Sequence, residues 1–96
     1  MKLELKLYIT AGTPKSMLAI SNLEKICSAC ARRLEMLGEE VEIDSTIIDI
    51  LEYPEKASEV GVFATPTLYV VKENVAPLVL LGDLTNIDDI LSLIER

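Results

Sequence analysis

The stretch Gly61-Val62-Phe63-Ala64-Thr65-Pro66-Thr67-Leu68-Tyr69-Val70-Val71-Lys72 decides how this chain of 96 residues folds. Residues 67–71 are apolar or β-branched, which is typical of a buried strand. Pro66 stands at the start of that strand, where proline removes no ladder hydrogen bond. An X-Pro bond at such a place is a candidate for a cis peptide, but cis is a small minority of X-Pro bonds in folded proteins. Composition alone therefore favours a trans Thr65–Pro66 bond.

Two longer elements are predicted upstream of this stretch. Residues 3–10 alternate between apolar and polar side chains, which is the period of a strand. The break at Ala11-Gly12-Thr13-Pro14 places Thr13 as a helix N-cap and Pro14 at the first helical position. Apolar side chains three and four residues apart then predict an amphipathic helix over residues 15–37, ending at Gly38. Its predicted apolar stripe is Ile20, Leu23, Cys27, Cys30, Leu34 and Leu37.

The remaining elements complete a βαβαββα order. A strand over residues 46–51 is followed by a short helix over 53–60, with Pro54 in its first turn. The strand over 67–71 and a short one over 78–81 form a hairpin, and Thr85 can cap a last helix over 86–95. A β-α-β start favours a parallel pair with a right-handed crossover. The sequence therefore predicts a single α/β domain over residues 1–96 with a mixed four-stranded sheet.

Composition excludes several classes of function. The net charge of −7 argues against a nucleic-acid surface, which needs clustered lysine and arginine. No apolar run approaches the roughly 20 residues that cross a bilayer. The first residues form a strand pattern rather than a signal peptide, so we expect a cytoplasmic protein that does not act on membranes. Two cysteines and no histidine leave no basis for a disulfide scaffold or a four-ligand zinc site within one chain.

Catalytic chemistry has little support in the residues. The Cys27-Ser28-Ala29-Cys30 motif lies roughly three helical turns into the predicted helix, on its apolar stripe. Burial there raises a thiol pKa, so we expect structural rather than redox cysteines. Dipole compensation and capping explain the carboxylates of Asp83, Asp88 and Asp89 near a helix start. Without a histidine base or a phosphate-binding loop, we predict a protein that is not an enzyme and has no cofactor or metal.

Four ordered motifs carry a resemblance to a known family. The order of elements, with Ala64-Thr65-Pro66-Thr67 before the third strand, resembles a thioredoxin-type fold. Nearly the whole chain resembles the KaiB family. The matching segments are Leu5-Lys6-Leu7-Tyr8-Ile9-Thr10-Ala11-Gly12-Thr13-Pro14-Lys15-Ser16, Ile48-Asp49-Ile50-Leu51-Glu52-Tyr53-Pro54, Ala64-Thr65-Pro66-Thr67-Leu68 and Leu81-Gly82-Asp83-Leu84-Thr85-Asn86.

This resemblance implies a protein-binding module without catalysis, which docks on the hexameric ATPase KaiC of a circadian oscillator. It implies docking through basic and polar residues near the first strand, the first helix and the central turn, for which the candidates are Lys6, Tyr8, Lys15 and Lys25. It also implies a cis Pro66 and structural roles for Gly12, Gly82 and Asp83.

The KaiB family is known to change fold. One form is a thioredoxin-like monomer that binds partners, and the other rearranges the C-terminal half and assembles as a tetramer. Residues 86–95 contain no glycine or proline, and their apolar spacing is helical, so we expect this chain to favour the thioredoxin-like form.

Two other functions stay open at this point. Val60-Gly61-Val62-Phe63 replaces a segment that is usually more charged in the family, and the chain as a whole is acidic. These departures favour a divergent paralogue, or a relative of the KaiB-like modules of sensor kinases, that binds a partner other than KaiC. The remaining alternative is a thioredoxin-like redox protein that uses Cys27 and Cys30.

Overall fold

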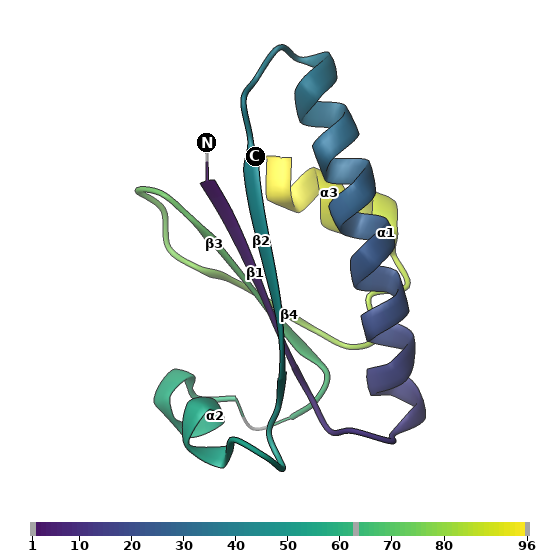
Figure 1. Ribbon diagram of the computed structural model, residues 1–96, viewed down its shortest axis with the longest axis vertical. Helices are drawn as coiled ribbons and strands as arrows, with labels where there is room; N and C mark the ends of the chain where they lie inside the picture. The colour runs from purple at the N-terminus through teal and green to yellow at the C-terminus, as the bar shows by residue number, and fades with distance from the viewer. Residues whose placement is uncertain (1, 63, 96) are drawn as a thin grey trace.

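The structure is a computed structural model that describes residues 2–62 and 64–95. Phe63, between Val62 and the Ala64-Thr65-Pro66-Thr67 motif, lies outside the described residues. The elements follow the predicted order (Figure 1). They are β1 (Lys2–Ile9), α1 (Pro14–Met36), β2 (Glu42–Asp49), α2 (Pro54–Val60), β3 (Thr67–Lys72), β4 (Leu78–Leu81) and α3 (Ile87–Glu95).

The four strands form one mixed sheet in the order β2-β1-β3-β4. β1 pairs parallel with β2 and antiparallel with β3, and β3 pairs antiparallel with β4. Helices α1 and α3 cover one face of the sheet, while α2 lies at one end of the opposite face (Figure 1). The predicted α/β class, the parallel first pair and the C-terminal hairpin are confirmed. No helix within the described ranges is long and apolar enough to cross a membrane.

Alternation along β1 divides the core into two clusters. Leu3, Leu5 and Leu7 have no exposed surface and pack beneath α1 and α3. Tyr8, on the opposite face, belongs to a smaller cluster with Ile48 of β2, Ala57 of α2 and Val62. The period of two in the sequence therefore builds two separate packing faces from one strand.

Strand β2 begins four residues earlier than the predicted 46–51 and ends two residues earlier. Its first residue, Glu42, pairs with Lys2, so the ladder uses the whole length of β1. Most β2 side chains are exposed because the strand is an edge of the sheet. Residues 42–45 therefore show little alternation of buried apolar side chains, and pairing with β1 overrides the weak local pattern.

The buried face of α1 is rotated slightly from the predicted stripe. Ile26 is fully buried, whereas Leu37 is 70% exposed. The helix ends at Met36, and the Gly38 and Glu39 amides donate to the carbonyls of Glu35 and Leu34. This pairing is a Schellman motif, which requires the positive φ of 75° at Gly38. The predicted stop at Gly38 is confirmed, but Leu37 belongs to the cap rather than to the buried face.

The two predicted threonine caps do not cap their helices. Thr13 occupies the N-cap position of α1, but its hydroxyl donates to the Thr10 carbonyl at 2.8 Å. Thr85 donates its hydroxyl to Asp83 Oδ1 at 2.6 Å, and α3 begins two residues later. Both hydroxyls stabilise the preceding turn instead, which is a common competing use of short polar side chains.

The Thr65–Pro66 peptide bond is cis. The resemblance to thioredoxin-type proteins predicts this isomer correctly. The expectation of a trans bond from composition alone is wrong.

Candidate docking surface

The four motif segments of the sequence meet at one end of the sheet, where β1 leads into α1. We call this region the motif end and define it as residues 10–16, 49–54, 64–67 and 82–85. Backbone bonds join β1 to β2 and the cis-proline turn to β4. The Ile50 amide donates to the Ile9 carbonyl at 2.9 Å, and the Gly82 amide donates to the Pro66 carbonyl at 3.0 Å. Segments far apart in sequence are therefore built into one region.

Side-chain hydrogen bonds connect the start of α1 to the rest of the motif end. The hydroxyls of Thr10 and Thr65 lie 2.6 Å apart, and Ser16 Oγ accepts the Thr10 amide at 3.1 Å. Ser16 is fully buried, so this bond satisfies its hydroxyl inside the fold. The resemblance places redox thiols of thioredoxin-like enzymes at this junction, where the present chain carries Thr13, Pro14, Lys15 and Ser16.

Asp83 organises the turn between β4 and α3. Its carboxylate accepts the Thr85 hydroxyl, and also the Thr85 amide at 3.2 Å. These two bonds, with a smaller contribution from the nearby charge of Lys15, hold the pKa of Asp83 below its usual value. Asn22 Nδ2 donates to the Asp83 carbonyl at 2.8 Å and so ties the turn to α1. These bonds fix the conformation of the turn and its position against α1.

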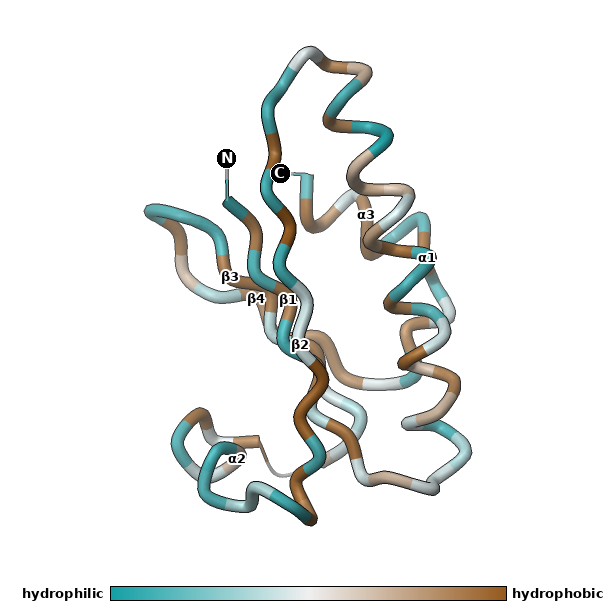
Figure 2. Tube along the Cα trace, viewed as in Figure 1, coloured by the Kyte–Doolittle hydropathy of each residue, from teal (hydrophilic) through white to brown (hydrophobic). Residues whose placement is uncertain are grey.

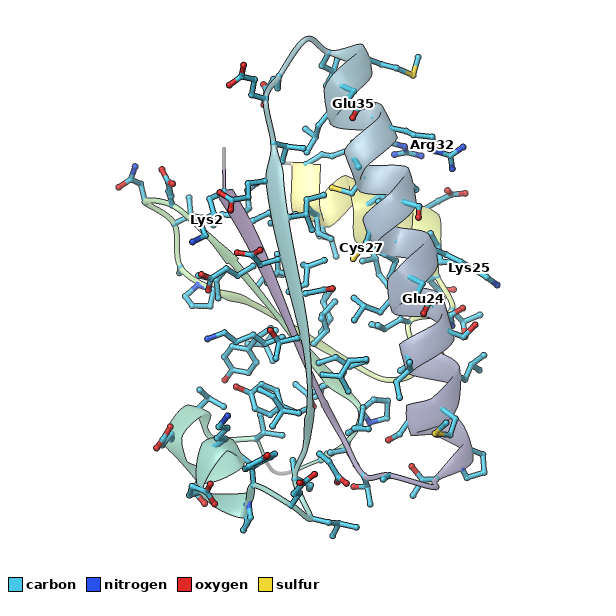
Figure 3. All side chains as sticks on the ribbon, viewed as in Figure 1. Lys2, Glu24, Lys25, Cys27, Arg32 and Glu35 are labelled. Carbon is cyan, nitrogen blue, oxygen red and sulfur yellow. The ribbon has the colours of Figure 1, made fainter. Side chains whose placement is uncertain are left out.

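The Cys27–Cys30 motif lies away from the motif end. Cys27 is half-buried and points from α1 toward the sheet (Figure 3), and Cys30 is fully buried. Burial is the main cause that raises the pKa of both thiols above their usual value. For Cys27, a side-chain hydrogen bond with Ser45 opposes that rise in pKa. The predicted packing of these thiols on the apolar side of the helix is confirmed.

The predicted docking residues lie on three different parts of the molecule. Lys15 is exposed at the motif end, and Lys25 points away from the sheet on the outer side of α1 (Figure 3). Lys6 is half-buried and lies on the sheet face opposite α1, because its neighbours Leu5 and Leu7 occupy the core face. The structure therefore does not unite these lysines in one patch.

Tyr8 does not fit the predicted docking role in this form of the protein. Its side chain is only 3% exposed. Its ring meets Tyr69 edge-on at a centroid distance of 5.7 Å, and burial is the main cause that raises its pKa. Tyr8 therefore packs the smaller core cluster and offers little surface to a partner.

The motif end also exposes apolar side chains that the sequence analysis did not single out. Leu51 is 69% exposed and Tyr53 is 42% exposed, in the turn between β2 and α2. Lys56 Nζ lies 4.7 Å from the centre of the Tyr53 ring, which places a positive charge over its face. Figure 2 shows that hydrophobic residues continue beyond β2 into this turn. The sequence pattern predicts Leu51 within the strand, but β2 ends at Asp49, so Leu51 lies in the exposed turn.

The exposed residues of the motif end combine apolar side chains with positive charge. Exposed apolar side chains with flanking lysines can bind another protein surface. In residues 2–62 and 64–95, no three His, Cys, Asp or Glu side chains are grouped so that they could hold a metal ion.

Comparison with solved structures defines the class of fold. Mitochondrial thioredoxin 3 from Saccharomyces cerevisiae superposes with a TM-score of 0.72 at 17% sequence identity, covering 97% of this chain and 76% of that chain. Thioredoxin from Fasciola hepatica gives a TM-score of 0.68 at 16% identity, covering 96% of this chain and 80% of that chain. The protein therefore has a thioredoxin-like fold.

Sequence comparison then gives the family. The family model for the KaiB domain matches residues 6–93. Circadian clock protein KaiB3 from Synechocystis is 36% identical over 91 residues, which cover 94% of this chain and 79% of the relative. Circadian clock oscillator protein KaiB from Parasynechococcus marenigrum is 38% identical over 64 residues, covering 67% of this chain and 54% of the relative. The chain belongs to the KaiB family.

Proposed function

We propose that this protein is a clock-type binding module that docks on a KaiC-like ATPase through the motif end. It acts in its thioredoxin-like form as a monomer, and it carries no catalytic chemistry of its own. The observation that carries the proposal is the convergence of all four family motifs on one region, with Lys15, Leu51 and Tyr53 exposed there.

Burial of the thiols supports a binding role over a redox role. A thiol that serves as a nucleophile needs access and a lowered pKa. Cys30 has neither, and the helix start at Pro14 lies far from both cysteines along α1. At the junction of β1 and α1, where a redox protein of this fold carries thiols, this chain has none.

Lys15 and Leu51 can be tested by binding of the purified chain to a KaiC-family ATPase in the presence of ATP. We expect Lys15→Glu and Leu51→Asp each to weaken binding by at least about tenfold, because a charge is reversed or introduced at the contact. Met36→Asp is the matched control, since Met36 is 86% exposed at the opposite end of α1. Lys25→Glu and Lys6→Glu report whether the other predicted lysines contribute.

A different partner is the second candidate, favoured by the net charge of −7 and by the apolar segment Val60-Gly61-Val62-Phe63. In that case the natural chain fails to bind KaiC-family ATPases but is captured by another signalling protein such as a kinase. Loss of this capture in Leu51→Asp, but not in Met36→Asp, would retain the motif end as the docking surface. Dithiol turnover that disappears when Cys27 and Cys30 are replaced would contradict both candidates.

A further inference from the structure

The two edges of the sheet differ in how they are protected. Edge strands present unpaired backbone groups, and charged side chains are one of the means by which natural proteins guard them. The β2 edge carries three acidic residues, Glu42, Asp44 and Asp49. The β4 edge is Leu78-Val79-Leu80-Leu81, which has no charged residue. A second copy of the chain would meet like charges at β2 but none within β4.

The backbone of β4 has a definite outward pattern. The Gly82 amide donates to the Pro66 carbonyl, so Gly82 directs its backbone groups toward the neighbouring strand. Hydrogen-bonded pairs alternate along an antiparallel ladder, and Leu80 is therefore the next residue whose groups face β3. The backbone groups of Val79 and Leu81 consequently point away from the sheet, toward solvent.

The same two residues expose apolar side chains. Val79 is 46% exposed and Leu81 is 74% exposed. They pair with Tyr69 and Thr67, on the sheet face opposite α1 and α3. Outward backbone groups and exposed apolar side chains therefore coincide at two positions.

We propose that β4 pairs antiparallel with β4 of a second copy of this chain, about a two-fold axis at Leu80. This register sets Val79 opposite Leu81 of the second copy, and Leu81 opposite Val79 of the second copy. Each of these is a hydrogen-bonded pair, so the contact forms four backbone bonds. The two sheets then continue as one sheet across the axis.

Self-complementarity is the reason for choosing a second copy as the occupant. Moving the axis to Val79 would set Leu81 opposite Pro77, which has no amide to donate. With the axis at Leu80, the outward backbone groups of Val79 and Leu81 are all paired in both strands. The exposed side chains of these two residues also meet across the axis. On the helical side, a hollow of about 250 Å³ beside β4, lined in part by Leu80, Ile90 and Leu93, leaves space for Leu80 of the second copy.

Charge makes this association weak and dependent on salt. Each chain carries a net charge of −7, so two copies repel at long range. Salt screens that repulsion, and the dimer therefore strengthens as ionic strength rises. A contact with a basic partner would show the opposite dependence on salt. The monomer of the proposed function is the dilute form of the same equilibrium.

Sedimentation over a range of protein and salt concentrations tests the dimer. We expect dimer to appear as protein concentration rises, and to increase when salt is added. Leu81→Lys raises the dissociation constant by at least about tenfold, because it sets a charge at the edge. Met36→Lys is the matched control, since Met36 is 86% exposed at the C-terminal end of α1, outside the motif end and β4, and it leaves the constant unchanged. A natural chain that stays monomeric at millimolar concentration overturns the proposal, as does an unaltered constant in Leu81→Lys.

Oxidative cross-linking tests the register. In Leu80→Cys the two new thiols face each other in a non-hydrogen-bonded pair, where Cα atoms lie about 4.5 Å apart and a disulfide can form. In Val79→Cys each new thiol faces Leu81 instead of its counterpart. We expect covalent dimer to form at least about tenfold faster in Leu80→Cys than in Val79→Cys. The natural chain shows how much cross-linking Cys27 and Cys30 cause by themselves. Equal or faster cross-linking of Val79→Cys overturns the register. If Leu80→Cys does not fold, the Leu81→Lys comparison decides.

Discussion

Cys27 and Cys30 occupy one side of α1 but differ in exposure, which makes them useful probes of packing. Cys30 has no exposed surface and Cys27 is half-buried. Because burial raises the pKa of both, little thiolate forms near neutral pH. We expect a thiol reagent at pH 7 to label Cys27 before Cys30, and both at least about tenfold more slowly than in denaturant. Rapid native labelling of Cys30 would contradict the packed helix.

The same burial predicts how stability depends on pH. A thiol whose pKa is raised in the folded state keeps its proton at a pH where the unfolded chain has already lost it. Ionisation therefore stabilises the unfolded state and lowers the free energy of unfolding. The stabilising contribution is therefore full below the usual pKa of 9.0 and is lost as pH rises through the folded value. Urea denaturation at pH 7, 9 and 10 should show a falling free energy of unfolding. Cys30→Ala should make that fall shallower.

Asn22 shows what a buried polar side chain contributes. It is 5% exposed, and its amide donates to the Asp83 carbonyl at 2.8 Å. We expect Asn22→Ala to lower the free energy of unfolding by about 1–3 kcal/mol, because the carbonyl loses its partner. Ser21→Ala, next in sequence on the exposed side of α1, should change it by less than about 0.5 kcal/mol. Equal effects of the two variants, measured by urea denaturation, would remove Asn22 from this role.

Buried polar side chains such as Asn22 are harder to predict from the sequence than buried apolar ones. Alternation identifies Leu3, Leu5 and Leu7 as core residues because they repeat with the period of a strand. Asn22 and Ser16 carry polar side chains, so an apolar pattern does not identify them as buried, and their partners lie in other segments. Tyr8 carries a polar tip in an alternating strand, so its burial beneath α2 could not be predicted before that helix was placed.

Gly61 sets the end of α2, the shortest helix. It adopts a φ of 73° at the C-cap, and the following Val62 amide donates to the Ala57 carbonyl at 2.9 Å. A side chain at this left-handed position costs about 1–2 kcal/mol. We therefore expect Gly61→Ala to destabilise the chain by about that amount, with Glu59→Ala, in the exposed part of the helix, as control. Hydrogen exchange should localise the loss of protection to α2, and unchanged exchange there would contradict the assignment.

The local sequence pattern predicts most helices and strands but not the residues at which they begin and end. The type and order of β1, α1, β3, β4 and α3 follow from period and turn residues. The start of β2 at Glu42 depends on pairing with Lys2, which no local pattern shows. The local pattern therefore predicts Leu51 in a strand, whereas it lies in the exposed turn of the motif end, and the sequence does not reveal this part of the candidate surface.

The whole molecule is held in its thioredoxin-like arrangement by the contact between α3 and α1. Ile90, Leu91 and Ile94 are buried in the main core cluster. Arg33 of α1 reaches Asp88 at 3.7 Å and Glu95 at 3.4 Å, near the two ends of α3. These ion pairs are exposed and contribute little, so the buried side chains carry the preference for this fold. A rearrangement of the C-terminal half would break the packing of these side chains.

Backbone chemical shifts of the natural chain in solution provide the test of that preference. We expect helical shifts over residues 87–94, and strand shifts there would show that the alternative fold predominates. Leu91→Ala should remove about 2–5 kcal/mol from the packed arrangement, because a fully packed leucine leaves a cavity. Two folds of one sequence can differ in free energy by only a few kcal/mol. We therefore expect Leu91→Ala to populate the alternative fold and to show a second set of chemical shifts. Ser92→Ala, on the exposed side of α3, should keep one helical set and serves as the control.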